Sequence, residues 1–98
     1  MFSQEKFGAR LRILRFKSGC TQADIARTLK MERSSYTYYE TGGVSPSFAS
    51  LVYLSKYYGV TTDWLLMGKA SNDFERELTA ELEERDYYSR EFKREKYI

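Results

Sequence analysis

The order of hydrophobic and polar positions predicts that the chain begins with a helix. Over residues 5–17 the large apolar side chains recur at spacings of four and three positions, which places them on one helical face. They are Phe7, Leu11 and Leu14. The basic residues of this segment mostly fall on its other faces: Arg10, Arg12, Arg15 and Lys17. The segment is therefore predicted to pack through one apolar face.

Four more short helices follow, and capping residues mark their ends. Thr21, a hydroxyl N-cap, begins a helix of about nine residues, and residues 33–40 form the next. Ser45 and Pro46 predict the start of a fourth helix, and residues 61–63 cap a last short turn. Of the five predicted helices, all except the one that begins at Thr21 end at a glycine: Gly19, Gly42, Gly59 and Gly68. The pattern predicts an all-α fold.

The rest of the chain predicts a hinge at residues 69–72 and then a charged helix, with Asn72 and Glu75 marking its start. Its apolar stripe is incomplete: Phe74, Leu78, Leu82, Tyr88 and Phe92. Opposite charges stand four residues apart, at Glu81 and Arg85 and at Asp86 and Arg90. We expect an exposed, partner-dependent helix, so the chain divides into a domain at residues 1–68 and this segment at residues 69–98.

Charge is distributed unevenly between the two parts. The formal net charge is +2, but residues 1–70 contain ten lysines and arginines against five acidic residues, whereas residues 71–98 contain six against nine. A basic domain suits a polyanionic partner, although surplus basic residues on a small domain as often serve only to keep its surface solvated. Charge alone therefore does not decide the function.

Composition excludes several kinds of site. The 98 residues include no histidine and one cysteine, which excludes His/Cys zinc sites, Ser-His-Asp triads and disulfide scaffolds. We expect no catalytic residue, metal or cofactor. The single Cys20 agrees with a reducing compartment, and no apolar run approaches a signal peptide or the roughly 18–20 residues that span a bilayer. We expect a cytoplasmic protein with no membrane partner and no small-molecule ligand.

Residues 21–42, TQADIARTLKMERSSYTYYETG, carry the most informative pattern, a short helix, a tight turn and a second helix. This segment resembles the helix-turn-helix of phage repressors, Cro proteins and bacterial xenobiotic-response-type regulators. The residues that match are Thr21, Gln22, Ile25, Ala26, Leu29, Tyr36, Glu40 and Gly42. Further matches extend from Arg15 to Gly68. The resemblance implies a five-helix repressor-like domain followed by a charged C-terminal helix.

The second helix of this motif is expected to contact DNA bases. Its polar side chains recur at helical spacing and suit the major groove: Arg33, Ser34, Thr37 and Tyr38. The resemblance assigns base edges to three of them and puts Thr37 near the DNA backbone or a thymine methyl. Arg33 could bind guanine through two hydrogen bonds, worth about 1–3 kcal/mol of discrimination. Outside this motif, Arg33 would more simply be a solvated residue.

Phosphate contacts are expected from residues around the same helix: Gln22, Thr21, Arg15 and Ser35. Gln22 matches the family's phosphate clamp, in which a side-chain amide and a helix N-terminus favour an anion. Its other interpretation is a polar first-turn residue. Arg15 and Glu40 match a family ion pair, which at the surface is worth about 0–1 kcal/mol.

Some positions depart from the family pattern. Lys30 stands where the turn usually has glycine, so a left-handed backbone there costs about 1 kcal/mol. Glu32 replaces the usual Ser or Thr cap. Tyr36 is larger than the usual Ile or Val, and we expect it in the core with Tyr39 and with Cys20 as a small apolar residue.

Two hypotheses follow. The first is a sequence-specific double-stranded DNA-binding regulator, a repressor bound as a homodimer to an inverted repeat, because one short helix reads only a few base pairs. The alternative is an antitoxin or adaptor whose acidic tail binds another protein. The protein partners that these hypotheses imply are an antirepressor or a toxin. An enzyme is the weakest option, since Asp24 and Glu40 have capping or pairing roles.

Overall fold

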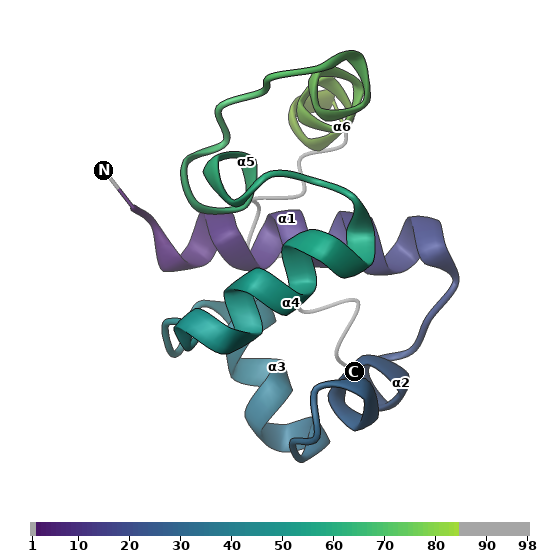
Figure 1. Cartoon of the computed structure of the whole chain (residues 1–98), viewed down its shortest axis with the longest axis vertical. Helices are drawn as coiled ribbons and strands as arrows, with labels where there is room; N and C mark the ends of the chain where they lie inside the picture. Colours follow the sequence, from purple (N-terminus) through teal and green to yellow (C-terminus); the bar gives the residue numbers. More distant parts are fainter. Residues whose placement is uncertain (1, 85–98) are drawn as a thin grey trace.

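The computed structural model describes residues 2–84, which form six helices and no strand (Figure 1). The helices are α1 (Gln4–Ser18), α2 (Gln22–Thr28), α3 (Arg33–Thr41), α4 (Phe48–Tyr58), α5 (Thr62–Met67) and α6 (Asp73–Glu84). Helix α1 crosses the middle of the molecule, with α2 and α3 on one side of it and α5 and α6 on the other (Figure 1). The predicted all-α fold, a helix-turn-helix domain followed by a C-terminal helix, is confirmed.

Glycines with a left-handed backbone end four of the helices, as the sequence predicts: Gly19, Gly42, Gly59 and Gly68. Helix α4 begins later than predicted. Ser47 is its N-cap, because its hydroxyl accepts a hydrogen bond from the Ser50 N–H at 3.1 Å. Ser45, which the sequence predicts as the cap, instead hydrogen-bonds the side-chain amide of Gln4 at 2.6 Å. Pro46 therefore precedes the helix.

Helix α1 is buried on all sides over its central part, because α3, α5 and α6 surround it. The buried stretch includes Arg10, Arg12 and Arg15, so the prediction of a single apolar packing face is wrong. Arg10 donates to the carbonyl of Leu65 at 3.0 Å, and Arg12 to that of Glu40 at 2.6 Å. Both carbonyls lie in last helical turns, which lack intrahelical partners. The arginines thus fasten α1 to the ends of α5 and α3.

One face of α3 packs against α1 in the hydrophobic core. Tyr36 and Tyr39 are buried, as the sequence predicts, and their rings meet edge to face at a centroid distance of 6.1 Å. A Cβ at Gly8 of α1 would lie 2.2 Å from the Glu40 carbonyl oxygen, so only glycine permits this close approach. The opposite face of α3 is left in contact with solvent.

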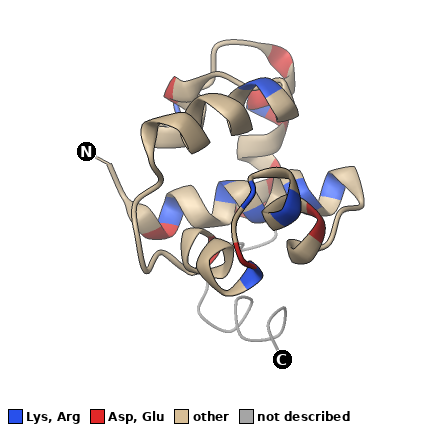
Figure 2. Cartoon of the chain, turned by 60° about the horizontal axis from the view of Figure 1, so that its bottom comes forward, with Lys and Arg blue, Asp and Glu red and all other residues tan. Residues whose placement is uncertain are grey.

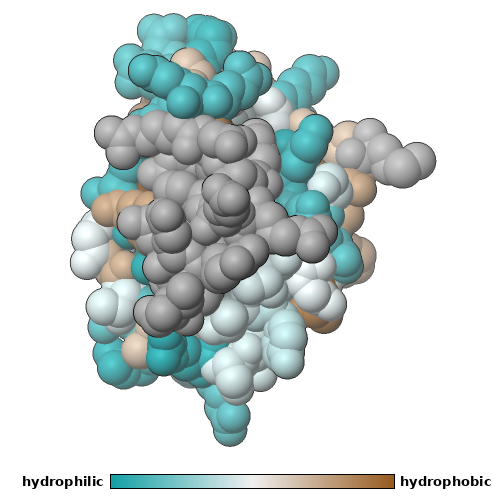
Figure 3. Space-filling view, turned by 180° about the vertical axis from the view of Figure 1, so that it is seen from behind, coloured by the Kyte–Doolittle hydropathy of each residue, from teal (hydrophilic) through white to brown (hydrophobic). Residues whose placement is uncertain are grey.

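Helix α6 belongs to the same hydrophobic core. Leu78 and Leu82 are fully buried, and the Trp64 indole N–H donates to the Thr79 hydroxyl at 2.9 Å. The expectation of an exposed, partner-dependent helix is therefore wrong for residues 73–84, because one face of this helix is buried in the core. Figure 3 shows that this end of the molecule is hydrophilic on the outside. The predicted pairs and stripe also involve residues outside the described part: Arg85, Asp86, Tyr88, Arg90 and Phe92.

Candidate nucleic-acid interface

The turn between α2 and α3 contains the left-handed residue that the sequence pattern predicts. Lys30 has a φ of 58°, and no other residue except glycine has a positive φ within residues 2–84. Helix α2 ends at Thr28 after seven residues, which is shorter than predicted. Glu32 is the N-cap of α3, but its side chain makes no capping hydrogen bond. The left-handed Lys30 therefore lets α3 begin shortly after α2 ends, at a small cost in backbone conformational free energy.

The outer face of α3 presents polar side chains to solvent. Arg33, Ser34 and Ser35 are exposed. Tyr38 is 58% exposed and Thr37 is half-buried. Arg33 and Thr37 lie one helical turn apart, and the same spacing separates Ser34 from Tyr38. The structure therefore brings together on α3 the four residues predicted to contact bases, with Ser35 beside them.

Glu40 holds α3 from the inside. Its side chain is fully buried, and Arg15 donates to both carboxylate oxygens, from Nε at 2.7 Å and Nη2 at 3.1 Å. The Tyr36 hydroxyl donates to the same carboxylate at 2.5 Å. Burial, and then the adjacent Glu40 carboxylate, raises the pKa of Tyr36 well above its ordinary value, so the hydroxyl keeps its proton. The sequence pattern predicts a surface pair between Arg15 and Glu40, whereas the structure buries it.

Gln22 connects α2 to these contacts. It is 6% exposed, its Nε2 lies 3.4 Å from Glu40 Oε1, and its Oε1 accepts from the Thr37 hydroxyl at 3.3 Å. Arg15 likewise donates to the Cys20 carbonyl at 3.2 Å, besides its bonds to Glu40. Gln22 and Arg15 are both predicted to contact phosphates, but their polar groups form hydrogen bonds inside the protein.

Thr21 and Ser35, the other two residues predicted to contact phosphates, are exposed. Thr21 also forms a reciprocal capping box with Asp24, in which each side chain accepts the other residue's N–H, at 3.1 Å and 3.0 Å. The bond from the Thr21 N–H is the main cause that lowers the pKa of Asp24. Thr21 therefore fixes the start of α2 while remaining at the surface.

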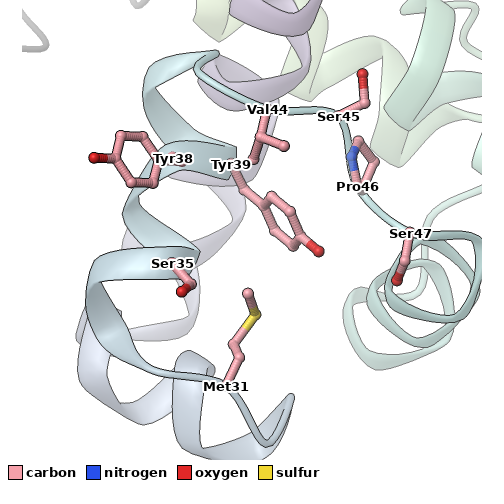
Figure 4. A pocket seen from close by; sticks show the side chains of 8 residues that line it. All are labelled: Met31, Ser35, Tyr38, Tyr39, Val44, Ser45, Pro46 and Ser47. Atoms are coloured by element: carbon pink, nitrogen blue, oxygen red, sulfur yellow. The ribbon is translucent and has the colours of Figure 1, made fainter.

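An open hollow of about 450 Å³ lies beside α3. Figure 4 shows Tyr39 and Met31 pointing toward it, while Tyr38 projects away from Tyr39. A Cβ at Gly43 would lie 2.8 Å from Cδ1 of Tyr38, so this glycine makes room for the ring. Gly43 directly follows Gly42, the glycine that ends α3. Gly43 does not have a positive φ, so its backbone conformation does not require glycine. A second glycine without such a requirement is the sequence signal that could have indicated the contact with Tyr38.

Three basic side chains lie around the turn between α2 and α3. Arg27, Lys30 and Arg33 are exposed there. Figure 2 shows further basic segments along α1, of which the three arginines are buried while Lys6 and Lys17 are exposed. Within residues 2–84, no group of His, Cys, Asp and Glu side chains could hold a metal ion. No helix in this part of the chain has the length and apolarity needed to cross a membrane.

Comparison with known proteins finds matches over the same region. A family model described as a helix-turn-helix domain matches residues 6–65. The SPbeta prophage-derived uncharacterized HTH-type transcriptional regulator YonR of Bacillus subtilis (strain 168) is 40% identical over 62 residues, which are 63% of this chain and 57% of YonR. The uncharacterized HTH-type transcriptional regulator YqaE of the same strain is 32% identical over 65 residues, 66% of this chain and 56% of YqaE.

A third relative is the HTH-type transcriptional activator BcrR of Enterococcus faecalis, 34% identical over 64 residues, 65% of this chain and 31% of BcrR. The chain thus spans about half the length of the first two relatives. No solved structure gives a significant match. The family match includes α2 and α3 and ends within α5, so α6 lies outside it.

Proposed function

The chain belongs to the helix-turn-helix domain family, and on that premise we propose that it is a transcriptional regulator that reads double-stranded DNA through α3. The observation that carries this proposal is the outer face of α3, where Arg33, Ser34 and Tyr38 are exposed while Glu40 anchors the helix from inside. A helix held in this way can enter the major groove without breaking contacts to its own domain.

The side chains of α3 suit base reading in different ways. Arg33 can donate two hydrogen bonds to guanine. Ser34 and Tyr38 carry hydroxyls that both donate and accept, so they can bond base edges. The Thr37 hydroxyl is engaged within the protein, since it donates to the Arg33 carbonyl at 2.9 Å and lies 3.3 Å from Gln22 Oε1, and we propose that its methyl group contacts a thymine methyl or the DNA backbone.

Phosphate contacts would set the position of α3 in the groove rather than its sequence preference. We propose that Thr21 and Ser35 supply them, because Thr21 is exposed at the start of α2 and Ser35 is exposed on α3. For Gln22 and Arg15 a phosphate contact would compete with their bonds to Glu40. We therefore propose that these two residues act mainly by positioning α3.

We further propose a homodimer that represses transcription from an inverted-repeat operator. A single short helix reads few base pairs, and two half-sites about one helical turn apart supply the missing specificity. The relative YonR is named as prophage-derived and BcrR as an activator, so a reporter gene must establish the sign. The proposal requires no catalysis, cofactor or small-molecule ligand, and its partner, DNA, implies a cytoplasmic location.

The testing experiment is selection of bound duplexes from a random-sequence pool, followed by a salt titration on the best sequence. We expect an inverted repeat and an affinity that falls steeply with salt. Arg33→Ala should then weaken binding about tenfold or more and relax the preference at one position of each half-site. Arg76→Ala on α6 removes another exposed positive charge, away from α3, and is the matched control.

Two results would overturn the proposal. Absence of any enriched sequence would exclude a groove-reading regulator, and would favour a protein partner for residues 71–98. Equal losses of affinity for Arg33→Ala and Arg76→Ala would mean that α3 has no special part in DNA binding.

A further inference from the structure

The carboxylate of Glu32 has no partner within the described part of the chain. Glu32 is exposed at the N-cap of α3, yet its side chain makes no capping hydrogen bond. It takes part in none of the ion pairs found within residues 2–84. Only its backbone serves the helix, since the Glu32 carbonyl accepts the Tyr36 N–H at 3.0 Å. The carboxylate is therefore available to a ligand.

The other two acidic residues of the segment 21–42 are engaged inside the fold. Asp24 closes the capping box at the start of α2. Glu40 is fully buried and paired with Arg15. Glu32 is thus the one carboxylate of the helix-turn-helix segment that has no structural role.

Glu32 lies at the end of α3 that would meet the bases. In a helix-turn-helix complex, the N-terminal residues of the recognition helix contact base edges. Glu32 directly precedes Arg33, and both are exposed. Successive residues rise by about 1.5 Å along a helix, and successive base pairs by about 3.4 Å along DNA. Glu32 and Arg33 can therefore reach the same base pair or adjacent base pairs.

Cytosine is the base that best suits a carboxylate in the major groove. A carboxylate only accepts hydrogen bonds, and among the bases only cytosine and adenine present a donor there, their amino groups. In adenine the neighbouring N7 is an acceptor, so it repels the second carboxylate oxygen. Guanine and thymine present acceptors alone. A carboxylate at the base edges therefore selects cytosine against the other three bases.

We propose that Glu32 is a specificity-determining residue, which accepts a hydrogen bond from the 4-amino group of a cytosine within one base pair of the guanine contacted by Arg33. This inference rests on the proposed function. With α3 in the groove, the negative charge of Glu32 repels the phosphates at every sequence. The bond to cytosine offsets this repulsion at the correct site alone, so Glu32 increases selectivity by weakening binding elsewhere.

The first test repeats the duplex selection with Glu32→Ala. The unmodified chain should select a cytosine within one base pair of the position that Arg33→Ala relaxes, and Glu32→Ala should relax that cytosine alone. The ratio of operator affinity to non-specific affinity should fall about tenfold or more. Glu32→Ala removes no side-chain hydrogen bond of the fold. The matched control is Glu77→Ala, which removes an exposed carboxylate of α6 and should leave the preference and the ratio unchanged.

A modified base tests the hydrogen bond itself. Replacing the selected cytosine by 2-pyrimidinone, which lacks the 4-amino group, should weaken binding of the unmodified chain about tenfold. The same replacement should leave the affinity of Glu32→Ala nearly unchanged. Any effect of the modified base on the duplex is common to both proteins, so the difference between them measures the bond to Glu32.

Three results would overturn the inference: no cytosine within one base pair of the Arg33 guanine, an unchanged base preference for Glu32→Ala, or equal losses for both proteins on the modified operator. A rise in affinity that is equal for all sequences would also overturn it, because Glu32 would then be only a repulsive charge. The proposed function stands in these cases if Arg33→Ala still relaxes the selected sequence. If the unmodified chain enriches no sequence, the proposed function fails together with this inference.

Discussion

Glu40 is the residue at which three helices meet. It accepts hydrogen bonds from Arg15 of α1, from Gln22 of α2 and from Tyr36 of its own helix. A buried carboxylate persists only when it is paired and hydrogen-bonded, because removing it from water is costly. Glu40 therefore sets the position of α3, although it lies on the side facing away from the proposed DNA contacts.

Glu40→Gln is expected to lower the free energy of unfolding by about 3–5 kcal/mol, because it leaves the Arg15 guanidinium buried without its anion. Urea denaturation of the purified chain measures this change. Replacing both partners, as Arg15→Met with Glu40→Leu, should cost less than the sum of the two single changes. A loss below about 1 kcal/mol for Glu40→Gln would indicate the weak surface pair that the sequence pattern predicts.

Gly43→Ala is expected to shift the base preference of the protein without unfolding it. The added Cβ would lie 2.8 Å from the Tyr38 ring, and this exposed ring can turn away. Repeating the duplex selection should show a changed preference only at the base pairs nearest Tyr38. In a Tyr38→Ala background the same substitution has no ring to displace, so an equal shift there would contradict the mechanism.

Among the elements, α5 and α6 are joined by one carboxylate. Glu75 of α6 is buried and accepts the N–H groups of Thr61 at 2.7 Å and Ser71 at 2.9 Å. Thr61 is the N-cap of α5. Asn72 caps α6, as the sequence predicts, by accepting the Glu75 N–H at 2.8 Å. The Glu75 carboxylate thus reaches across to the start of α5.

This junction predicts a pH dependence of stability. Burial favours the neutral form of Glu75, but the hydrogen bonds from Thr61 and Ser71 outweigh it and hold the pKa below its ordinary 4.5. A lowered pKa in the folded state stabilises the fold above the unfolded-state value, and this contribution disappears as pH falls through the lowered pKa. The unmodified chain should therefore lose its stability advantage over Glu75→Gln below about pH 4.5.

Thermal melts across the acid range measure that loss. Glu77→Gln changes an exposed carboxyl on the same helix and should follow the unmodified chain. If Glu75→Gln follows it as well, the junction does not depend on the Glu75 charge.

In the whole molecule, a helix outside the matched family region completes the core. The family match ends at residue 65, yet Leu78 and Leu82 of α6 are buried in one cluster with Trp64. We therefore propose residue 68 as the end of the part of the chain that reads DNA. Whether residue 68 is also a folding boundary can be tested.

Cutting the chain after residue 70 should lower the free energy of unfolding by several kcal/mol. Burial of Leu78 and Leu82 alone contributes about 1.5–3 kcal/mol each. Chemical denaturation measures the loss, and a chain cut after residue 84 keeps every contact described for α6 and serves as the control. Equal stability of the two shortened chains would make residue 68 a folding boundary as well.

Most helix positions could be predicted because helix ends are local features. A glycine with positive φ or a hydroxyl cap acts within a few residues, so the ends at Gly19 and Gly59 and the cap at Thr21 follow from the sequence. The wrong cap is predicted for α4 because two serines, Ser45 and Ser47, lie close together before it. The contact between Ser45 and Gln4, which is distant in sequence, leaves Ser47 as the cap.

The sequence by itself determined the helices, the turn at Lys30 and the polar side chains of α3, because periodicity and backbone preference are properties of short segments. Only the tertiary structure decided which side chains are buried. The α1 arginines, Gln22 and the pair of Arg15 with Glu40 are enclosed by helices distant in sequence, whereas Phe48 and Val52 of α4 are left exposed. Burial depends on which elements surround a residue, and the pattern of one segment does not contain that information.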